Sequence, residues 1–428
     1  MPPTTTPAIS GTRASTSIPG LIARCADTAD VVRAVQFARA NAVRAAVRGG
    51  GHNVAGRALC DEGIVIDLSA MNHVTVDAGS RTVRVQGGAL LGDIDRATHP
   101  HGLAVPTGVV SKTGIGGLAS GGGVGWLVRK YGMTCDNLLA CEVVTADGEI
   151  VSADATTNAG LFWGLRGGGG NFGIVTSFVF QAHPVSTVLG GLILYPRDQA
   201  GAMLRHFRAF MPTAPDELTV YAGLISAPDG TPVVGMLPCY CGDLAEGERV
   251  LAPLRAFGTP VVDAIQPMPF IEMQKLLDGA YPDRAYNYWK STFVTDLSDD
   301  LLDIVVEHAN RALSPLSGVV LELYGGAAGR VASGDTAFAQ RQAKYNVGMM
   351  AQWLDPADSE RNIAWARTIA AAVEPYSAGV HYLNFLDDEN PDQIRRSFGS
   401  NYARLAELKK QYDPTNFFSL NLNVPPRG

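Results

Sequence analysis

The first 185 residues carry short apolar runs that predict strands alternating with helices. Residues 27–41 place apolar side chains at helical spacing, with Thr28 as a candidate N-cap. Residues 63–69 and 81–88 are continuous or alternating apolar runs that predict strands, and 138–153 has the pattern of a strand hairpin. We therefore expect this part of the chain to be α+β.

The apolar pattern changes near residue 186. From there on, strand-like runs alternate with helical segments, which predicts a separate α+β domain. Within the last 40 residues we expect a helix that stops at Asp413, because Pro414 follows it. The strands predicted for the middle of the chain are 189–196, 218–225, 231–241, 318–325 and 345–353, and the helices are 198–211, 243–257, 298–314 and 358–374.

Composition narrows the class of protein. With 428 residues, of which 46% are hydrophobic and 18% charged, the chain is typical of a globular protein with two or three domains. The formal net charge is -7 and no Lys/Arg-rich run occurs, which argues against a nucleic-acid groove. No apolar run reaches the ~20 residues of a membrane helix, and the N-terminus lacks the apolar core of a secretory signal. We expect a cytoplasmic protein that binds neither nucleic acid nor membrane.

The spacing of cysteine and histidine argues against a disulfide framework and a metal site. The six cysteines are too dispersed for a disulfide scaffold in a chain of this length. Cys239 and Cys241 form a C-x-C pair, which either binds a metal or places two thiols on a strand. No second Cys or His pair stands near them, which favours the strand. We expect reduced thiols and no metal ligand.

Three segments are rich in glycine. Residues 47–56 are VRGGGHNVAG, seven glycines lie between residues 114 and 125, and residues 167–170 are four consecutive glycines. Such segments have few side chains to pack, and their bare backbone approaches an anionic or flat ligand that a Cβ would hold away. A dinucleotide is the obvious candidate.

Gly168, Gly170 and Gly173 satisfy the G-x-G-x-x-G spacing of a dinucleotide-binding βαβ unit. That unit needs a helix after the glycines and an acidic residue about 20 positions further on. Here β-branched and aromatic residues follow and predict a strand, and Asp198 is too distant. The sequence therefore disfavours a Rossmann-type site.

Four motifs follow one another along residues 25–424: RGGGHNVAG, TGIGGLASGGGVG, LFWGLRGGGGNFGIVT and KKQYDPTNFFSLN. Together they resemble the berberine-bridge-enzyme-like flavoproteins, which are FAD-linked oxidases with a p-cresol-methylhydroxylase-type FAD domain. The resemblance implies an α+β fold in which a two-subdomain FAD-binding domain joins an antiparallel-sheet substrate domain backed by helices. It assigns residues 15–185 and 388–428 to the FAD-binding domain and residues 186–387 to the substrate domain.

The resemblance also implies how FAD is held. His52 stands where the family links the flavin 8α-methyl carbon, and a neutral imidazole nitrogen is a suitable nucleophile for that bond. The alternative is a histidine that caps the loop or hydrogen-bonds the ring without a covalent link. Many relatives carry a second link through a cysteine, but Val110 occupies that position, so we expect a single link. The other expected FAD contacts are Arg48, Gly49, Gly50, Gly51, Asn53, Thr113, Gly114, Gly117, Gly121, Gly122, Gly173, Val175, Asn421 and Asn423.

Tyr382 matches a family tyrosine that often serves as a base or substrate anchor. Because a free phenol has a pKa near ~10, a base role needs a lowered pKa; a ring that only packs in the interface is the equal alternative. On the strand 345–353, Gly348 replaces the glutamate or glutamine of plant relatives, which leaves Asn346 and Gln352 as polar candidates beside Tyr382. The side chains expected to form an apolar pocket are Met349, Met350, Trp353 and Phe385.

The resemblance implies an FAD-dependent oxidase that takes hydride from a C–H next to oxygen or nitrogen of a small organic molecule, with dioxygen as the final acceptor and hydrogen peroxide as product. Secondary metabolism is the expected context. Two other functions remain open at this point. One is a flavoprotein cyclase or isomerase of natural-product biosynthesis with no net redox change, and the other is a binding or sensing protein.

Overall fold

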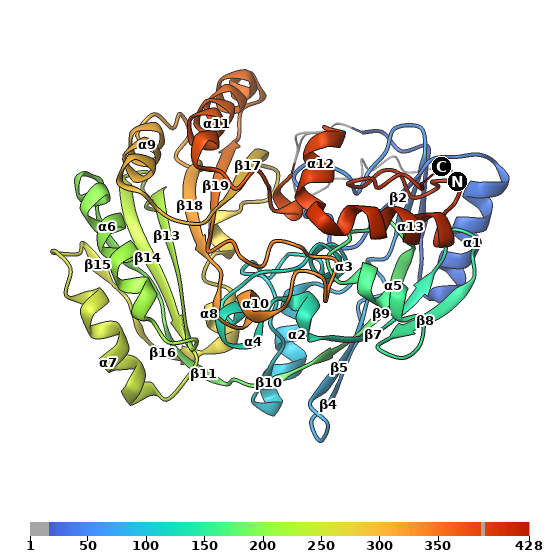
Figure 1. Cartoon of the computed structure of the whole chain (residues 1–428), viewed down its shortest axis with the longest axis horizontal. Helices are drawn as coiled ribbons and strands as arrows, with labels where there is room; N and C mark the ends of the chain where they lie inside the picture. Colours follow the sequence, from blue (N-terminus) through green and yellow to red (C-terminus); the bar gives the residue numbers. More distant parts are fainter. Residues whose placement is uncertain (1–16, 387–389, 428) are drawn as a thin grey trace.

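The structure is a computed structural model that describes residues 17–386 and 390–427. Figure 1 shows two parts side by side: one contains both ends of the chain, and the other contains its middle. The chain enters the sheet of the second part just after residue 186. The domain limits expected at residues 15, 387, 388 and 428 lie outside the described residues. The mixture of helices and sheets confirms the predicted α+β class.

A small parallel sheet begins the first part. In spatial order it contains β1 (Leu21–Arg24), β3 (Ile64–Asp67) and β2 (Ala45–Arg48), and α1 (Thr28–Ala40) packs against it. The N-cap of α1 is Asp27, whose side chain accepts a hydrogen bond from the Asp30 amide, so the expected cap at Thr28 is wrong. The Thr28 hydroxyl instead donates to the Glu142 carboxylate at 2.8 Å. The His52 loop starts directly after β2, so this sheet positions it.

The second sheet of this part has five antiparallel strands. In spatial order they are β4 (Val74–Asp77), β5 (Thr82–Gln86), β9 (Ile174–Gln181), β7 (Leu138–Val144) and β8 (Ile150–Asp154). The predicted hairpin is confirmed as β7 and β8, and β9 is the strand predicted after the third glycine segment. Alternate residues of β9 are buried, and two of them, Phe178 and Phe180, pack in one core with α2 (Leu91–Thr98) and α5 (Ala159–Leu165). Since a strand follows these glycines, the helix of a Rossmann unit is not present there.

The middle of the chain forms a nine-stranded antiparallel sheet. Its main path is β15 (Val262–Asp263), β12 (Ile193–Pro196), β14 (Pro232–Tyr240), β13 (Leu218–Ser226), β18 (Gly318–Leu323), β19 (Tyr345–Trp353) and β17 (Tyr286–Val294), and β11 (Thr187–Gly190) with β16 (Gln266–Pro269) pairs alongside β14. The helices α6 (Ala200–Phe210), α7 (Leu244–Arg255), α9 (Asp299–Ala309) and α11 (Ser359–Val373) cover its outer side in Figure 1.

The predicted elements of this middle part occur, but one predicted strand is divided, and β15, β16, α8 (Phe270–Gln274) and α10 (Gly326–Arg330) were not predicted. The strand expected over 189–196 is divided into β11 and β12 at Gly191, which has φ 141°. The strand β17 was not predicted. Almost every residue of β17 is buried or nearly so on both faces, so its sequence lacks the alternation that marks a half-exposed strand.

The C-terminal segment returns to the first part as two helices, α12 (Pro391–Phe398) and α13 (Tyr402–Tyr412), where a helix ending at Asp413 was expected. Gly399, with φ 54°, separates them. The fully buried Lys409 ammonium donates to the Asp413 carboxylate at 2.7 Å and to the carbonyls of Asn171 and Phe418 at 2.8 and 2.9 Å. This network fastens the C-terminal return to the third glycine segment.

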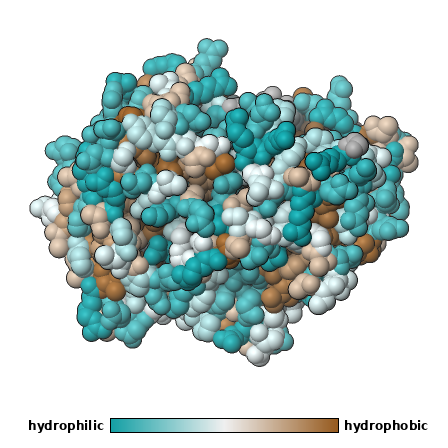
Figure 2. Space-filling model, viewed as in Figure 1, coloured by the Kyte–Doolittle hydropathy of each residue, from teal (hydrophilic) through white to brown (hydrophobic). Residues whose placement is uncertain are grey.

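Polar side chains cover most of the face shown in Figure 2, with apolar residues scattered among them. In the described part of the chain, no helix combines the length and apolar character needed to cross a membrane. The same residues contain no cluster of three His, Cys, Asp or Glu side chains suited to a metal ion. All six cysteines are buried free thiols.

Candidate functional site

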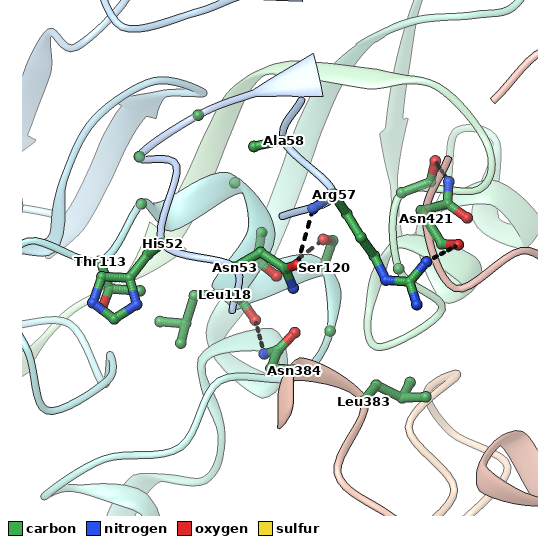
Figure 3. A pocket seen from close by; sticks show the side chains of 18 of the residues that line it. His52, Asn53, Arg57, Ala58, Thr113, Leu118, Ser120, Leu383, Asn384 and Asn421 are labelled. Carbon is green, nitrogen blue, oxygen red and sulfur yellow. Dashed lines mark hydrogen bonds between the residues drawn. The ribbon is translucent and has the colours of Figure 1, made fainter. Parts of the chain in front are cut away.

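A cavity of about 330 Å³ lies between the glycine-rich segments and the nine-stranded sheet. Figure 3 shows His52 and Thr113 on one side of it and Arg57 and Asn421 on the other. The first part of the chain contributes the segments 49–53, 113–121, 169–175 and 420–422 to the wall, with gaps. The middle part contributes Tyr281, Trp289, Glu322 and Met350, and Tyr382–Phe385 completes the wall. Segments far apart in sequence thus converge on one space.

Glycine is required where two of these loops touch. A Cβ on Gly50 would lie 2.5 Å from the Gly114 nitrogen, and a Cβ on Gly114 would lie 2.2 Å from the Gly50 nitrogen. Gly117 differs, because a Cβ there would meet no atom within 4 Å although the residue lines the cavity. The loops therefore form a cradle that is tightly packed behind and open towards the cavity.

His52 is half-buried at the edge of this cradle, beside Thr113 (Figure 3). Burial lowers the pKa of His52 below its ordinary value, and the charge of Lys112 lowers it further. A hydrogen bond with its own backbone and the charge of Asp278 act in the opposite direction but do not reverse the shift. The imidazole is therefore neutral at pH 7.

Val110 is buried and lines the cavity, and none of the six cysteines does so. The neighbouring Ser111 is held by Asp278 of the middle part. Its backbone N–H donates to one Asp278 oxygen at 2.8 Å, and its hydroxyl donates to the other. The loop that carries Val110 is thereby fixed across the boundary between the two parts.

Arg57 lines the cavity, whereas Arg48, the arginine expected from the sequence, does not. The Arg48 guanidinium lies 3.3 Å from the Asp67 carboxylate and is not part of the cavity wall. Arg57 is the one Lys or Arg among the described lining residues. Its Nη1 donates to the Asn421 carbonyl at 3.1 Å, and its backbone N–H donates to the Asn53 side chain at 3.2 Å. Sequence reasoning missed Arg57, and its place five residues after His52 was the available signal.

Most of the other expected FAD contacts reach the wall. Asn421 does so, and its Oδ1 is buried without a hydrogen-bond partner, while its Nδ2 donates to the Gly170 carbonyl at 2.7 Å. Gly122 and Asn423 do not line the cavity; a Cβ on Gly122 would meet Met133 instead. The expected residues that do line it are Gly49, Gly50, Gly51, His52, Asn53, Thr113, Gly114, Gly117, Gly121, Gly173, Val175 and Asn421.

Tyr382 lies between the two parts and is 3% exposed. Its hydroxyl oxygen accepts hydrogen bonds from the Gly123 backbone N–H at 3.1 Å and from Asn384 Nδ2 at 3.0 Å. Burial raises the pKa of Tyr382 well above its ordinary value, whereas these two donors lower it. Its ring packs edge-on against Phe385, with centroids 5.0 Å apart. The tyrosine is thus an interface residue whose oxygen is also held by donors that favour a phenolate.

The strand β19 reaches the cavity through Met350 only. Asn346 is fully buried and does not line the cavity. The Gln352 backbone N–H donates to the Ser317 hydroxyl, and the Gln352 side chain does not line the cavity either. The expectation that Met349 and Trp353 line the pocket is wrong. They face the core under the helices, because successive residues of a strand point to opposite sides.

Glu322, on β18, is a second residue of the cavity wall that sequence reasoning missed. It is the one carboxylate among the described residues that line the cavity, and it is 5% exposed. Asn346 Nδ2 donates to its Oε2 at 2.8 Å. Burial raises the pKa of Glu322 to about 7, against the lowering effect of that hydrogen bond. The signal in the sequence was a lone acid within the apolar run GVVLEL.

Known proteins match this chain along nearly its whole length. Residues 19–154 match the family model of an FAD binding domain, and residues 381–425 match that of berberine and berberine-like proteins. An FAD-linked oxidoreductase of Dictyostelium discoideum is 33% identical and covers 93% of this chain and 86% of its own length. The (R)-6-hydroxynicotine oxidase of Paenarthrobacter nicotinovorans is 32% identical, and the match covers 96% of this chain and 92% of that protein.

The chain belongs to the berberine-bridge-enzyme-like FAD-linked oxidoreductases. The crystal structure of 6-hydroxy-D-nicotine oxidase from Arthrobacter nicotinovorans has the same fold, with a TM-score of 0.90 at 30% identity over 98% of this chain and 95% of that one. The expected family and its p-cresol-methylhydroxylase-type architecture are confirmed.

The cavity suits the cofactor of this FAD-linked family. Gly117 leaves free space where a Cβ would project, and the Asn421 Oδ1 is a buried acceptor without a partner. A flat ring with donor and acceptor edges fits such a wall. The backbone of Gly49–Asn53 and the guanidinium of Arg57 offer donors for negatively charged groups.

Proposed function

We propose that this protein is an FAD-dependent oxidase of a small organic molecule, oxidised at a C–H next to oxygen or nitrogen. One observation carries the proposal: the glycine cradle and the residues Trp289, Glu322, Met350 and Tyr382 belong to a single continuous cavity. A flavin in the cradle would therefore face a substrate held by the sheet. When bound, FAD accepts hydride and is reoxidised by dioxygen, with hydrogen peroxide as product.

We also propose that FAD is linked to the chain through His52 alone. A nucleophilic imidazole must be unprotonated, and burial keeps His52 in that form. Val110 supports a single link, because a buried aliphatic side chain offers no nucleophile at the second position. Arg57 supplies the positive charge for an anionic group of the cofactor, a role that the sequence had suggested for Arg48.

Tyr382 is the proposed base. The two hydrogen bonds that its oxygen accepts favour the phenolate, but burial still raises its pKa, so the base role requires bound flavin to lower that pKa further. Asn346 contributes as a positioning residue, since it orients the Glu322 carboxylate and stays off the wall. Gln352 has no contact with the cavity, which argues against a direct part in the reaction.

The free buried thiols also support a reducing compartment, and we propose the cytoplasm and a role in secondary metabolism. The oxidase is tested by adding candidate alcohols and amines to the FAD-loaded protein without oxygen. An oxidase substrate bleaches the flavin band, and air restores the band with release of one peroxide per turnover. Conversion of a substrate without bleaching would instead establish the cyclase or isomerase.

A further inference from the structure

The substrate side of the cavity contains a buried carboxylate without a positive partner. The Glu322 carboxylate is 5% exposed and accepts one hydrogen bond, from Asn346, within the described residues. Among the described residues, burial and the Asn346 hydrogen bond are the influences on its pKa, with no contribution from a Lys, Arg or His. Taking a carboxylate out of water without a cation is costly, so such a group is stable only if it is protonated or meets a positive ligand.

Aromatic side chains surround the space that this carboxylate faces. The rings of Tyr281 and Trp289 lie 5.6 Å apart, and Trp289 meets Phe385 edge-on at 5.4 Å. The Tyr281 hydroxyl donates to the Met350 sulfur at 3.4 Å and is thereby occupied. The wall therefore offers π faces and a soft sulfur, with few free hydrogen-bonding groups for a polyhydroxylated ligand.

We infer that this pocket binds a protonated amine attached to an apolar or aromatic body. The Glu322 carboxylate supplies the counter-charge, and the rings of Tyr281, Trp289 and Phe385 attract the cation through their faces. The inference rests on the proposed function in taking this pocket as the substrate site, and it narrows the substrate class from alcohols and amines to amines.

Glu322 is the group in this pocket that changes charge near neutrality. The phenols around it are those of Tyr221 on β13, Tyr324 directly after β18, Tyr281 in the segment before β17, and Tyr382. Burial raises the pKa of each, so all four stay neutral. Across the cavity, the pKa of His52 is lowered. The charge of the pocket between pH 6 and 7.5 therefore follows Glu322, whose pKa is raised to about 7.

The test uses two probes of equal shape, 4-tert-butylphenol and the cation in which trimethylammonium replaces the tert-butyl group. Dissociation constants are measured on the FAD-loaded protein from the change in flavin absorption. We expect the cation to bind at least about tenfold more tightly at pH 7.5. The preference should shrink as the pH falls to 6, because a protonated Glu322 has no charge to offer.

E322Q should remove the preference while keeping a side chain of the same shape. The matched control is D95N, since Asp95 is also buried and its pKa is also raised to about 7, but it lies outside the cavity wall. D95N should leave the preference unchanged. Equal affinities for the two probes, no binding of either, or a preference that survives in E322Q would overturn the inference. If E322Q does not fold, the pH series on the unmodified protein tests the inference, and a preference that does not fall between pH 7.5 and 6 would overturn it.

Failure of the inference and failure of the proposed function are distinguishable. If a neutral alcohol bleaches the flavin and the two probes bind equally well, the amine-binding inference would be wrong and the oxidase proposal would stand. If the cation binds more tightly but no substrate reduces the flavin, the amine-binding inference would stand and the oxidase proposal would be wrong. In a protein that retains no flavin, the same titration can be followed by tryptophan fluorescence, because Trp289 lines the pocket.

Discussion

The backbone N–H of Gly123 donates a hydrogen bond to the Tyr382 hydroxyl at 3.1 Å, across 259 positions of sequence. It connects the second glycine segment directly to the proposed base. The phenol oxygen also accepts from Asn384, so one donor from the glycine segment and one from its own segment fix its position. The second glycine segment and the proposed base are therefore linked directly.

Replacing Tyr382 by Phe should slow flavin reduction by about 100-fold or more, which is the usual contribution of a general base. The ring contacts remain, but the proton acceptor is lost. The measurement is the anaerobic rate of bleaching with saturating substrate, together with flavin content and melting temperature. Tyr324→Phe is the matched control, because that hydroxyl is buried without a partner and lies off the wall. An unchanged rate in Tyr382→Phe would leave the tyrosine only a packing role.

His52→Ala should abolish the covalent link and leave the fold intact, since His52 is only half-buried. Denatured wild-type protein should stay yellow, and the denatured variant should release all its colour. A mass increase on the wild-type peptide that contains His52 locates the bond. His73→Ala, an exposed histidine away from the cavity, should behave as wild type. Free flavin released from the denatured wild type would contradict the link.

Arg57→Gln should weaken FAD binding by about 10- to 100-fold, the usual effect of losing a hydrogen bond to a charged group. The loss is measured in a His52→Ala background, where FAD exchanges freely, by titrating the apoprotein. Arg48→Gln is the control, because Arg48 pairs with Asp67 off the wall. If the two variants lose FAD equally, or neither does, the assignment of Arg57 is wrong.

Two glycine variants should separate folding from cofactor binding. Gly50→Ala places a Cβ 2.5 Å from the Gly114 backbone and should destabilise the fold by about 1–3 kcal/mol. Gly117→Ala meets no protein atom within 4 Å, so it should fold normally and bind FAD more weakly. Thermal unfolding of the apoproteins and FAD titration distinguish the two effects. A Gly117→Ala variant that binds FAD like wild type would show that the cofactor does not contact this wall.

The sequence by itself determined the family, the glycine-rich cradle and most strands of the middle sheet. It could do so because these features are local: a glycine run leaves a bare backbone wherever it occurs, and apolar periodicity follows from strand and helix geometry. The loop that carries His52 was found this way, whereas the predictions for Val110 and Tyr382 came from the family resemblance. Each motif is a continuous stretch of sequence, so it can be recognised without knowledge of the others.

Only the tertiary structure decided which charged groups face the cavity. Arg48 and Arg57 are close in sequence. Only the packing shows that Arg48 pairs with Asp67 and that Arg57 lines the cavity. Glu322 is hidden in an apolar strand, and its meeting with Asn346 depends on the register between β18 and β19. Trp289 comes from β17, which has no alternating pattern to predict. Pairing between distant strands decides such contacts, and no local spacing in the sequence records it.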